Sequence, residues 1–355
     1  MIKEPRKQEW IYMEYFAGAN TRSGFVSLFD DAFSDVKRLY ILKGSSGCGK
    51  STFMKRIAGK AQRLGYKVDL IYCSGDPDSI DGVIIPQIGK AVADGTNPHS
   101  LDTKYPCVRE SIINLGDFWD EGTLLPHRDE IIRLTDSKSA HYKNAYRILS
   151  TLGDTLDIKR SLISQCTDKQ KLDRAAIRLV DKLTEARGGI RSIFASAFTF
   201  SGIKTIPVFG EVDRLIEVKG KCTEAFMTAV ERIARERGVE AIISRSPIDA
   251  SISDAVYFPS SSTLISSCNV APCTFAKEKK SVITSRFTDS GALQSVKLKL
   301  HGIEKFSYEL LAEAQKELLK AREAHSEIER IYIPSMDFAA LDEFTVSFTE
   351  RFFAE

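Results

Sequence analysis

The 355-residue sequence lacks the features of several large protein classes. Its seven cysteines form no CxxC pair, and their odd number does not suit a disulfide framework, so reduced thiols are expected. No stretch has the roughly twenty consecutive apolar residues that a membrane span needs, and the opening MIKEPRKQEW has no signal-peptide core. We therefore expect a cytoplasmic location and no membrane partner.

An excess of charge of one sign is also missing. The 50 basic and 48 acidic residues leave a net charge of +2, so no overall field attracts nucleic acid or anionic lipid. Hydrophobic residues at 43% and charged residues at 28% are typical of globular chains, and the length suits two domains. The composition gives no clear nucleic-acid signal.

The strongest local pattern that is present is a glycine-rich loop between a predicted strand and a predicted helix. Residues 39–42 form an apolar run typical of a buried strand, and apolar residues recur at helical spacing from Phe53 to Ala61. Between them, GSSGCGKS at residues 44–51 fits the Walker A pattern GxxxxGK[ST]. The glycines let backbone N–H groups turn toward phosphate oxygens at a helix N-terminus. The residues expected to bind the nucleotide are Gly44, Ser45, Ser46, Gly47, Cys48, Gly49, Lys50, Ser51 and Thr52.

Two side chains of this loop have predicted roles. Lys50 should reach the β- and γ-phosphates, and the Ser51 hydroxyl should ligate the Mg²⁺ that bridges them. No NKxD pattern is present to read guanine, which favours ATP over GTP. An LSGGQ-like signature is also missing, which disfavours an ABC-type ATPase.

Asp94 is the first candidate for a second metal ligand beside Ser51. It ends the apolar run IGKAVAD, which would place its carboxylate at the ligand-binding rim of a parallel sheet. The following DGTNPH would bring His99 to the same rim. An Asp-Gly turn with a surface histidine is the alternative interpretation of this segment.

Further acidic candidates follow the second predicted strand, in SGDPDSIDG. Asp76 and Asp81 could hold metal or activate a phosphoryl acceptor, whereas turn and helix-cap chemistry would explain the same residues without a catalytic role. Arg128 or Arg133 could neutralise a transferred phosphoryl group. The predicted catalytic set is Lys50, Asp94, Asp76, Asp81 and His99.

The second half of the sequence repeats the first half without the loop chemistry. FAGANTRSGF recurs as FASAFTFSGI, and VKRLYILKG recurs as VDRLIEVKG. After Gly220 the chain reads KCTEAF, a shorter loop that lacks the GKS lysine, and Asp94 aligns with Ser267. We therefore expect one nucleotide per chain and a pseudo-dimer formed within the chain.

The expected fold is α/β, with two tandem P-loop NTPase-like lobes built on parallel sheets and each followed by a helical hairpin. The predicted domains are residues 1–188, with the active loop, and residues 189–355, with the degenerate copy. Asp168 and Asp337 are plausible caps for the closing helices.

These motifs together resemble an uncharacterised bacterial family of tandem P-loop ATPases, found largely in spore-forming and anaerobic Gram-positive bacteria. The resemblance spans nearly the whole chain, and the narrower strings that carry it include DPDSIDG, DGTNPH and LGDFWD. It implies ATP binding, a cytoplasmic location and ATPase or nucleotide-kinase-like activity, with no established substrate. Members of the family commonly look able to bind nucleotide in both halves, and this chain departs from that pattern.

Three functions are compatible with the sequence. The first is a Mg²⁺-dependent ATPase or phosphotransferase that acts on an unknown small-molecule or protein partner. The second is a nucleotide or small-molecule kinase, and the third is a nucleotide sensor or scaffold without turnover. Turnover that rises with a metabolite would favour the kinase, whereas turnover that rises with a protein fraction would favour the ATPase switch.

Overall fold

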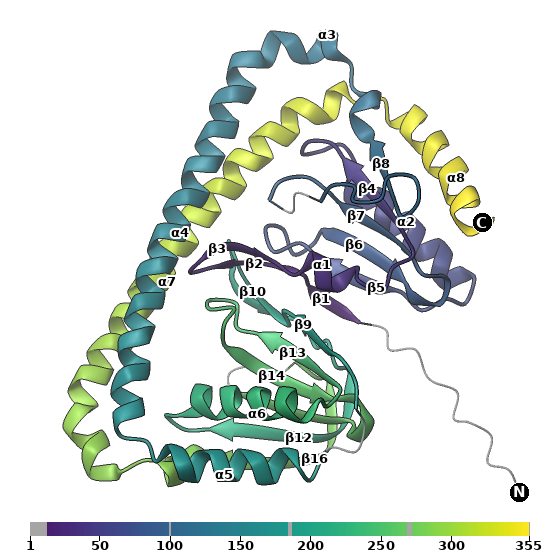
Figure 1. Cartoon of the computed structure of the whole chain (residues 1–355). Helices are drawn as coiled ribbons and strands as arrows, with labels where there is room; N and C mark the ends of the chain where they lie inside the picture. Colours follow the sequence, from purple (N-terminus) through teal and green to yellow (C-terminus); the bar gives the residue numbers. More distant parts are fainter. Residues whose placement is uncertain (1–12, 99–100, 184–186, 268–271, 355) are drawn as a thin grey trace, which may run out of the picture.

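The computed structural model describes residues 13–98, 101–183, 187–267 and 272–354. Two α/β lobes with the same order of elements are joined by two long helices, which lie side by side along their length (Figure 1). The prediction of an α/β chain with helices after each sheet is confirmed.

The first lobe contains eight strands and a short segment of helices before the first long helix. In chain order its elements are β1 Glu14–Phe16, β2 Gly18–Thr21, β3 Gly24–Ser27, α1 Phe29–Ala32, β4 Arg38–Lys43, α2 Lys50–Arg63, β5 Asp69–Tyr72, β6 Ile80–Ile85, β7 Lys90–Asp94, β8 Glu110–Asn114, α3 Glu121–Leu124, α4 Arg128–Gln165 and α5 Lys169–Val180.

The second lobe repeats this order with a longer strand before its loop. Its elements are β9 Ile190–Ile193, β10 Ser196–Thr199, β11 Gly202–Thr205, β12 Glu211–Lys219, α6 Thr223–Arg237, β13 Ala241–Arg245, β14 Ser253–Phe258, β15 Thr263–Ser267, β16 Phe275–Ile283, α7 Ser290–Tyr332 and α8 Phe338–Ala354.

Each lobe is built on a six-stranded sheet that is mixed, so the prediction of parallel sheets is wrong in this respect. The first sheet has the order β1-β5-β6-β7-β4-β8, and β6 runs antiparallel to both of its neighbours. In the second sheet, β14 does the same. The physical reason is the length of the connections. Residues 73–79 and 86–89 are too short for the crossover of a dozen or more residues that parallel neighbours require.

The helices cross between the lobes. After α4 has run from the first lobe to the second, α5 packs against α6 and shares its hydrophobic core. After α7 has run back, α8 packs on the first lobe, where its aromatic residues join the core around α2 and β4. The last helix of the chain therefore completes the lobe that contains the Walker A loop (Figure 1).

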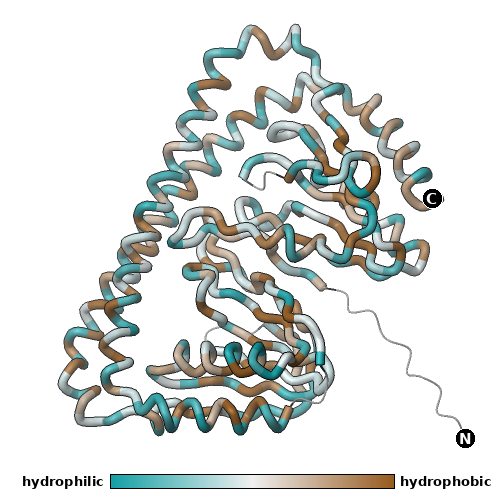
Figure 2. The backbone as a smooth tube through the Cα atoms, viewed as in Figure 1, coloured by the Kyte–Doolittle hydropathy of each residue, from teal (hydrophilic) through white to brown (hydrophobic). Residues whose placement is uncertain are grey.

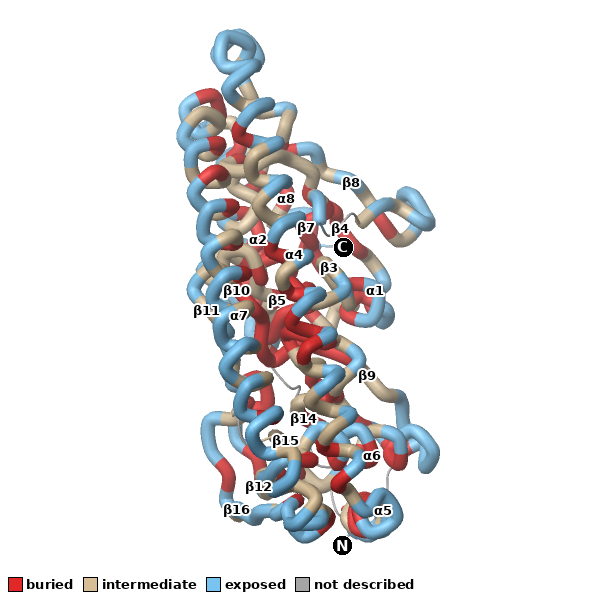
Figure 3. The backbone as a smooth tube through the Cα atoms, turned by 90° about the vertical axis from the view of Figure 1, so that its left-hand side faces the viewer, coloured by how far each residue is buried: buried red, intermediate tan, exposed pale blue. Residues whose placement is uncertain are grey.

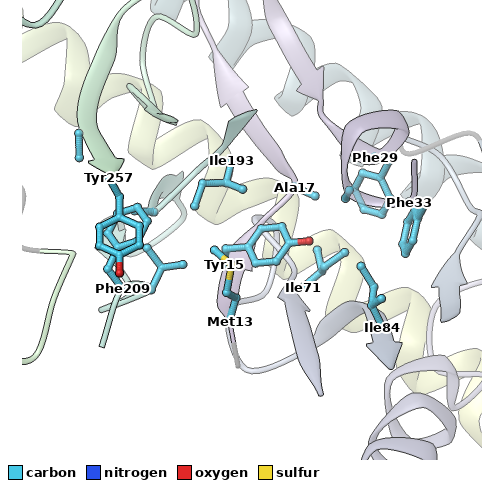
Figure 4. Packing of buried hydrophobic residues seen from close by; sticks show 14 of the residues in the cluster. Met13, Tyr15, Ala17, Phe29, Phe33, Ile71, Ile84, Ile193, Phe209 and Tyr257 are labelled. Carbon is cyan, nitrogen blue, oxygen red and sulfur yellow. The ribbon is translucent and has the colours of Figure 1, made fainter. Parts of the chain in front are cut away.

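A single hydrophobic cluster also crosses from one lobe to the other. Tyr15 and Ile71 of the first lobe lie in the same buried cluster as Ile193, Phe209 and Tyr257 of the second (Figure 4). Between the same two lobes, the backbones of residues 16 and 194 exchange two hydrogen bonds, of 2.9 and 3.0 Å. The two lobes thus share one hydrophobic cluster, in addition to the separate core of each lobe.

The long helices are amphipathic along their contact. Figure 2 shows hydrophobic positions recurring between hydrophilic ones on both, and Leu149, Leu152, Ala314 and Leu318 are buried where the helices meet. Their outer sides are exposed in the turned view of Figure 3. Within the residues that the structure describes, no helix is both long enough and apolar enough to cross a membrane.

Asp69, at the start of β5, is expected to make stability depend on pH. Its side chain is buried and accepts a 3.0 Å hydrogen bond from the Met13 backbone N–H. Burial raises its pKa to about 6, although the charge of Arg191 lowers it. Because the folded state holds this proton more tightly than the unfolded state, stability falls as the pH rises from about 4 to about 6.

Asp69→Asn mimics the protonated carboxyl, so it should match the parent protein at pH 4 and be more stable by about 3 kcal/mol at pH 7. Urea unfolding at the two pH values measures the difference. Asp136→Asn, which changes an exposed aspartate of α4, is the control. An equal effect of Asp69→Asn at both pH values would contradict the prediction.

Candidate functional site

The Walker A loop connects the end of β4 to the start of α2. Gly47 and Gly49 have φ angles of +77° and +83°, the left-handed region that glycine adopts without a steric penalty. Gly49 is the N-cap of α2 and has no side chain to cap the first amides, which leaves these N–H groups for a bound anion. The loop therefore turns at two left-handed glycines and leads into α2 without a side-chain cap.

Lys50 places its ammonium group at the mouth of this loop. The Nζ atom donates hydrogen bonds of 2.8 and 2.9 Å to the carbonyl oxygens of Gly44 and Ser45. It lies 3.7 Å from Oδ2 of Asp94, and both side chains are only 12% exposed. Burial raises the pKa of the neighbouring Cys48 thiol, which keeps this loop residue neutral.

Asp94 ends β7, directly beside the strand that leads into the loop. Leu42 of β4 is paired with Asp94 in the register of the sheet, and Val218 of β12 is paired with Ser267 in the same way. The register thus confirms that Asp94 and Ser267 are equivalent. Oδ1 of Asp94 accepts hydrogen bonds from the Thr96 backbone N–H at 2.8 Å and hydroxyl at 2.6 Å, which fixes the carboxylate.

The acidic residues after β5 lie in different environments. Asp76 accepts a 3.0 Å hydrogen bond from the Ser79 hydroxyl and lies 3.5 Å from the Arg322 guanidinium. Asp81 is only 4% exposed, and its charge helps to raise the pKa of the neighbouring Cys73 thiol. The Asp76 side chain is thus partly exposed, whereas Asp81 is enclosed. His99 lies outside the residues that the structure describes.

Ser51 lies between the loop and this acidic segment. Its hydroxyl oxygen accepts a 3.2 Å hydrogen bond from the Ile80 backbone N–H, beside Asp81. Hydroxyl and carboxylate oxygens are the hard ligands that Mg²⁺ prefers, so Ser51 and Asp94 fit the ion by type. Within the described ranges, no three His, Cys, Asp or Glu side chains converge to hold a metal ion on their own. A magnesium ion here would therefore need phosphate oxygens as further ligands.

The end of α7 lies against the Walker A loop, which the sequence analysis did not anticipate. Nδ1 of His325 lies 3.2 Å from the Ser46 hydroxyl, and Glu329 lies 3.4 Å from both His325 and Arg322. A side chain at Gly47 would collide with Ile333, whose Cγ1 lies 2.9 Å from the Cβ position. The loop is thus covered by a helix that begins in the other lobe.

Helix α4 contributes a second basic residue to this region. Burial lowers the pKa of Lys138, and the nearby charge of Lys50 lowers it further, whereas Glu329 raises it. By contrast, Arg128 and Arg133, the predicted lid residues, are exposed, and Arg128 pairs with the adjacent Asp129 at 2.9 Å. A comparison of the two halves of the sequence could have identified Lys138. The equivalent position of α7 is occupied by Ser307, so the lysine is specific to the half with the complete loop.

The corresponding loop of the second lobe is short and closed. Only Gly220, Lys221 and Cys222 separate β12 from α6, and Lys221 pairs with Glu304 at 3.0 Å. Glu224 lies in the first turn of α6, where an anion would need positive potential. This loop offers a phosphate group neither a nest of glycines nor an available lysine.

Comparison with known protein families, curated proteins and solved structures finds no match to this chain. The functional argument therefore depends on the geometry of the site and on the difference between the two lobes.

Proposed function

We propose that the chain binds ATP with Mg²⁺ at residues 44–51 and hydrolyses it, at one site per chain in the first lobe. The observation that carries the proposal is the largely buried pair of Lys50 and Asp94 beside the two left-handed glycines of a loop that opens α2. A cation, a carboxylate and unsatisfied N–H groups at the end of neighbouring strands are what a triphosphate with a divalent ion requires. The resemblance of the sequence to tandem P-loop ATPases supports the same function.

Each residue of the site has a role in this proposal. The backbone N–H groups after Gly47 cradle the phosphates, and Lys50 exchanges its carbonyl partners for β- and γ-phosphate oxygens. Ser51 and Asp94 support the magnesium ion, directly or through water, and the ion offsets the negative charge that develops in the reaction.

Hydrolysis is favoured over transfer to a second substrate. A kinase of the kind that the sequence allows would use Asp76 or Asp81 near an acceptor hydroxyl. Asp81 is buried, and Asp76 is engaged by Ser79 and Arg322 under the end of α7. The end of α7 also covers the loop at Ser46 and Gly47, which favours water over a bulky acceptor.

The nucleoside has a candidate position beside the loop. A hollow of about 280 Å³ between α2 and α8 begins at Gly49 and Thr52 and is lined on its other side by Phe338 and Leu341. The lining combines aromatic and apolar side chains with polar ones, among them Arg56 and Asp342, which pair at 2.7 Å, and such mixed walls can hold both the base and the sugar of a nucleoside. We propose that the base extends from the loop into this hollow.

Asp94→Asn provides the first test. The amide keeps an oxygen for Thr96 but removes the charge that supports the ion, so Mg²⁺-dependent ATP turnover should fall by about tenfold to a hundredfold. Phosphate release measured against Mg²⁺ concentration checks this. The control is Asp78→Asn, which changes an exposed aspartate of the neighbouring segment.

Turnover of the Asp94→Asn protein at the parental level, with the same Mg²⁺ dependence, would show that Asp94 does not support the ion. Binding of ATP by the parent protein without phosphate release would instead identify a sensor.

A further inference from the structure

The two long helices carry different residues at the two sites they cover. Asp120 and Asp289 begin equivalent segments, because each backbone N–H donates a 2.8 Å hydrogen bond to the far end of the other long helix, at Ser335 and Cys166. Asp168 and Asp337, at the other ends of the long helices, are equivalent for the same reason, since their backbone N–H groups donate 2.8 Å hydrogen bonds to Phe287 and Phe118. The separation in sequence between Asp120 and Asp289 equals that between Asp168 and Asp337. This fixes the correspondence along α4 and α7.

The four polar residues over the Walker A loop are all replaced over the degenerate loop, where the one charged replacement, Arg160, is held by Glu224 at 3.3 Å and Asp249 at 2.9 Å. At the second site, the position of Lys138 is occupied by Ser307, and that of Arg322 by Gly153. The positions of His325 and Glu329 are occupied by Leu156 and Arg160. The lobe that lost the loop chemistry has therefore also lost the helix residues that face it. A purely structural helix contact would have no reason to change together with the loop.

Asp76 of the first lobe corresponds to Asp249 of the second, and each of them contacts an arginine. The two arginines are held by their partners in different ways. At the degenerate site, Arg22 of the β2–β3 turn contacts Asp154, Asp157 and Asp249 at 2.8, 2.6 and 3.3 Å. It occupies the space left by Gly153, where a Cβ atom would lie 2.2 Å from the Arg22 Nε. Three carboxylates thus lock this arginine in place.

Arg322 at the Walker A site has looser partners. Its guanidinium lies 3.5 Å from the Asp76 carboxylate and 3.4 Å from that of Glu329, and the side chain is 27% exposed. Both distances exceed the usual 2.7–2.9 Å of a charge-assisted hydrogen bond. The long contacts with Asp76 and Glu329 keep the guanidinium near the loop and leave its N–H donors available to a stronger acceptor.

We propose that Arg322 binds the terminal phosphate of the nucleotide and is the catalytic residue that distinguishes ATP from ADP. This inference rests on the proposed function. With ATP in the loop, the guanidinium leaves Asp76 and Glu329 and donates to γ-phosphate oxygens, for which its planar donors are well suited.

The same contact assists hydrolysis. The oxygen of the attacking water forms a bond to the γ-phosphorus while the bond to the β–γ bridging oxygen breaks, and the electron pair of that bond stays with ADP. The water gives up a proton to solvent, so the products are ADP, phosphate and a proton. Arg322 offsets the charge on the phosphoryl oxygens during this step.

Because Arg322 is part of α7, its position depends on a helix that begins in the second lobe. Loss of the γ-phosphate returns the guanidinium to Asp76 and Glu329. The partners of a residue in α7, the helix that joins the lobes, thus depend on whether the nucleotide has a third phosphate.

The experiment compares ADP with a nonhydrolysable ATP analogue by calorimetry, in the parent protein and in Arg322→Ala, Arg322→Lys and Arg330→Ala. Arg330 is an exposed arginine on the same helix and serves as the control. We expect the parent to prefer the analogue, and Arg322→Ala to lose about tenfold or more of its analogue affinity while its ADP affinity changes by less than about twofold. Arg322→Lys should recover part of the preference, and turnover should fall with it.

Unchanged ADP affinity also shows that the Arg322→Ala protein is folded. If that protein keeps the parental ratio of analogue to ADP affinity and the parental turnover, the assignment of Arg322 is overturned while the nucleotide site stands. Failure of the parent protein to bind either nucleotide overturns both proposals.

Discussion

Lys50→Ala should abolish detectable tight binding of Mg-ATP. The Lys50 ammonium is largely buried between two loop carbonyls and the Asp94 carboxylate, so its removal leaves both the phosphates and Asp94 without their nearest cation. Truncating one partner of such a charge pair costs about 2–5 kcal/mol, which corresponds to a loss of affinity of about thirtyfold or more. Calorimetry with a nonhydrolysable ATP analogue measures this loss.

The second lobe provides the matched control for this substitution. Lys221 follows Gly220 in the degenerate loop, but it is half exposed and paired with Glu304, so Lys221→Ala should leave affinity unchanged. The parent protein should bind one nucleotide per chain. A stoichiometry near two, or undiminished affinity after Lys50→Ala, would contradict the assignment of the site to the first lobe.

Phe348→Ala in α8 should destabilise the protein by about 3–5 kcal/mol, although this residue is far along the chain from the Walker A loop. Its ring is buried against Tyr40 and Phe53 of the first lobe, at centroid distances of 5.0 and 5.3 Å. Removing it leaves a cavity between α8 and the sheet that supports the loop. The free energy of unfolding in urea measures the effect.

The control for this prediction is on the same helix. Val346 is 58% exposed, so Val346→Ala should change stability by no more than about 0.5 kcal/mol. Equal effects of the two substitutions would show that α8 does not pack on the first lobe as described.

The sequence predicted the local features of the site well, because they follow from short-range rules. Glycine spacing indicated the left-handed turns at Gly47 and Gly49, and the end of an apolar run indicated the position of Asp94. The repeat identified the lobe whose loop lacks the GKS lysine, and the register of Val218 with Ser267 agrees with that alignment.

The sequence could not predict features that depend on long-range packing. The apolar run of β6 was not recognised as a strand, and its short connections make the sheet mixed. Periodicity in residues 290–332 shows which face of α7 is apolar but not which lobe that face reaches. The contact of Arg322 with Asp76 joins residues far apart in the chain, so it appears only once the helix has been placed in space.

The crossed arrangement of the helices also sets the order in which the lobes can mature during synthesis. The strands of the second lobe and its packing helix α5 are contiguous, whereas the strands of the first lobe end at Asn114 and its packing helix begins at Phe338. At a synthesis rate of about 5–20 residues per second, roughly 10–45 s pass between the synthesis of the last strand of the first lobe and that of α8. The lobe made second can therefore complete its core first, and the Walker A loop receives its full support only after α8 has been synthesised.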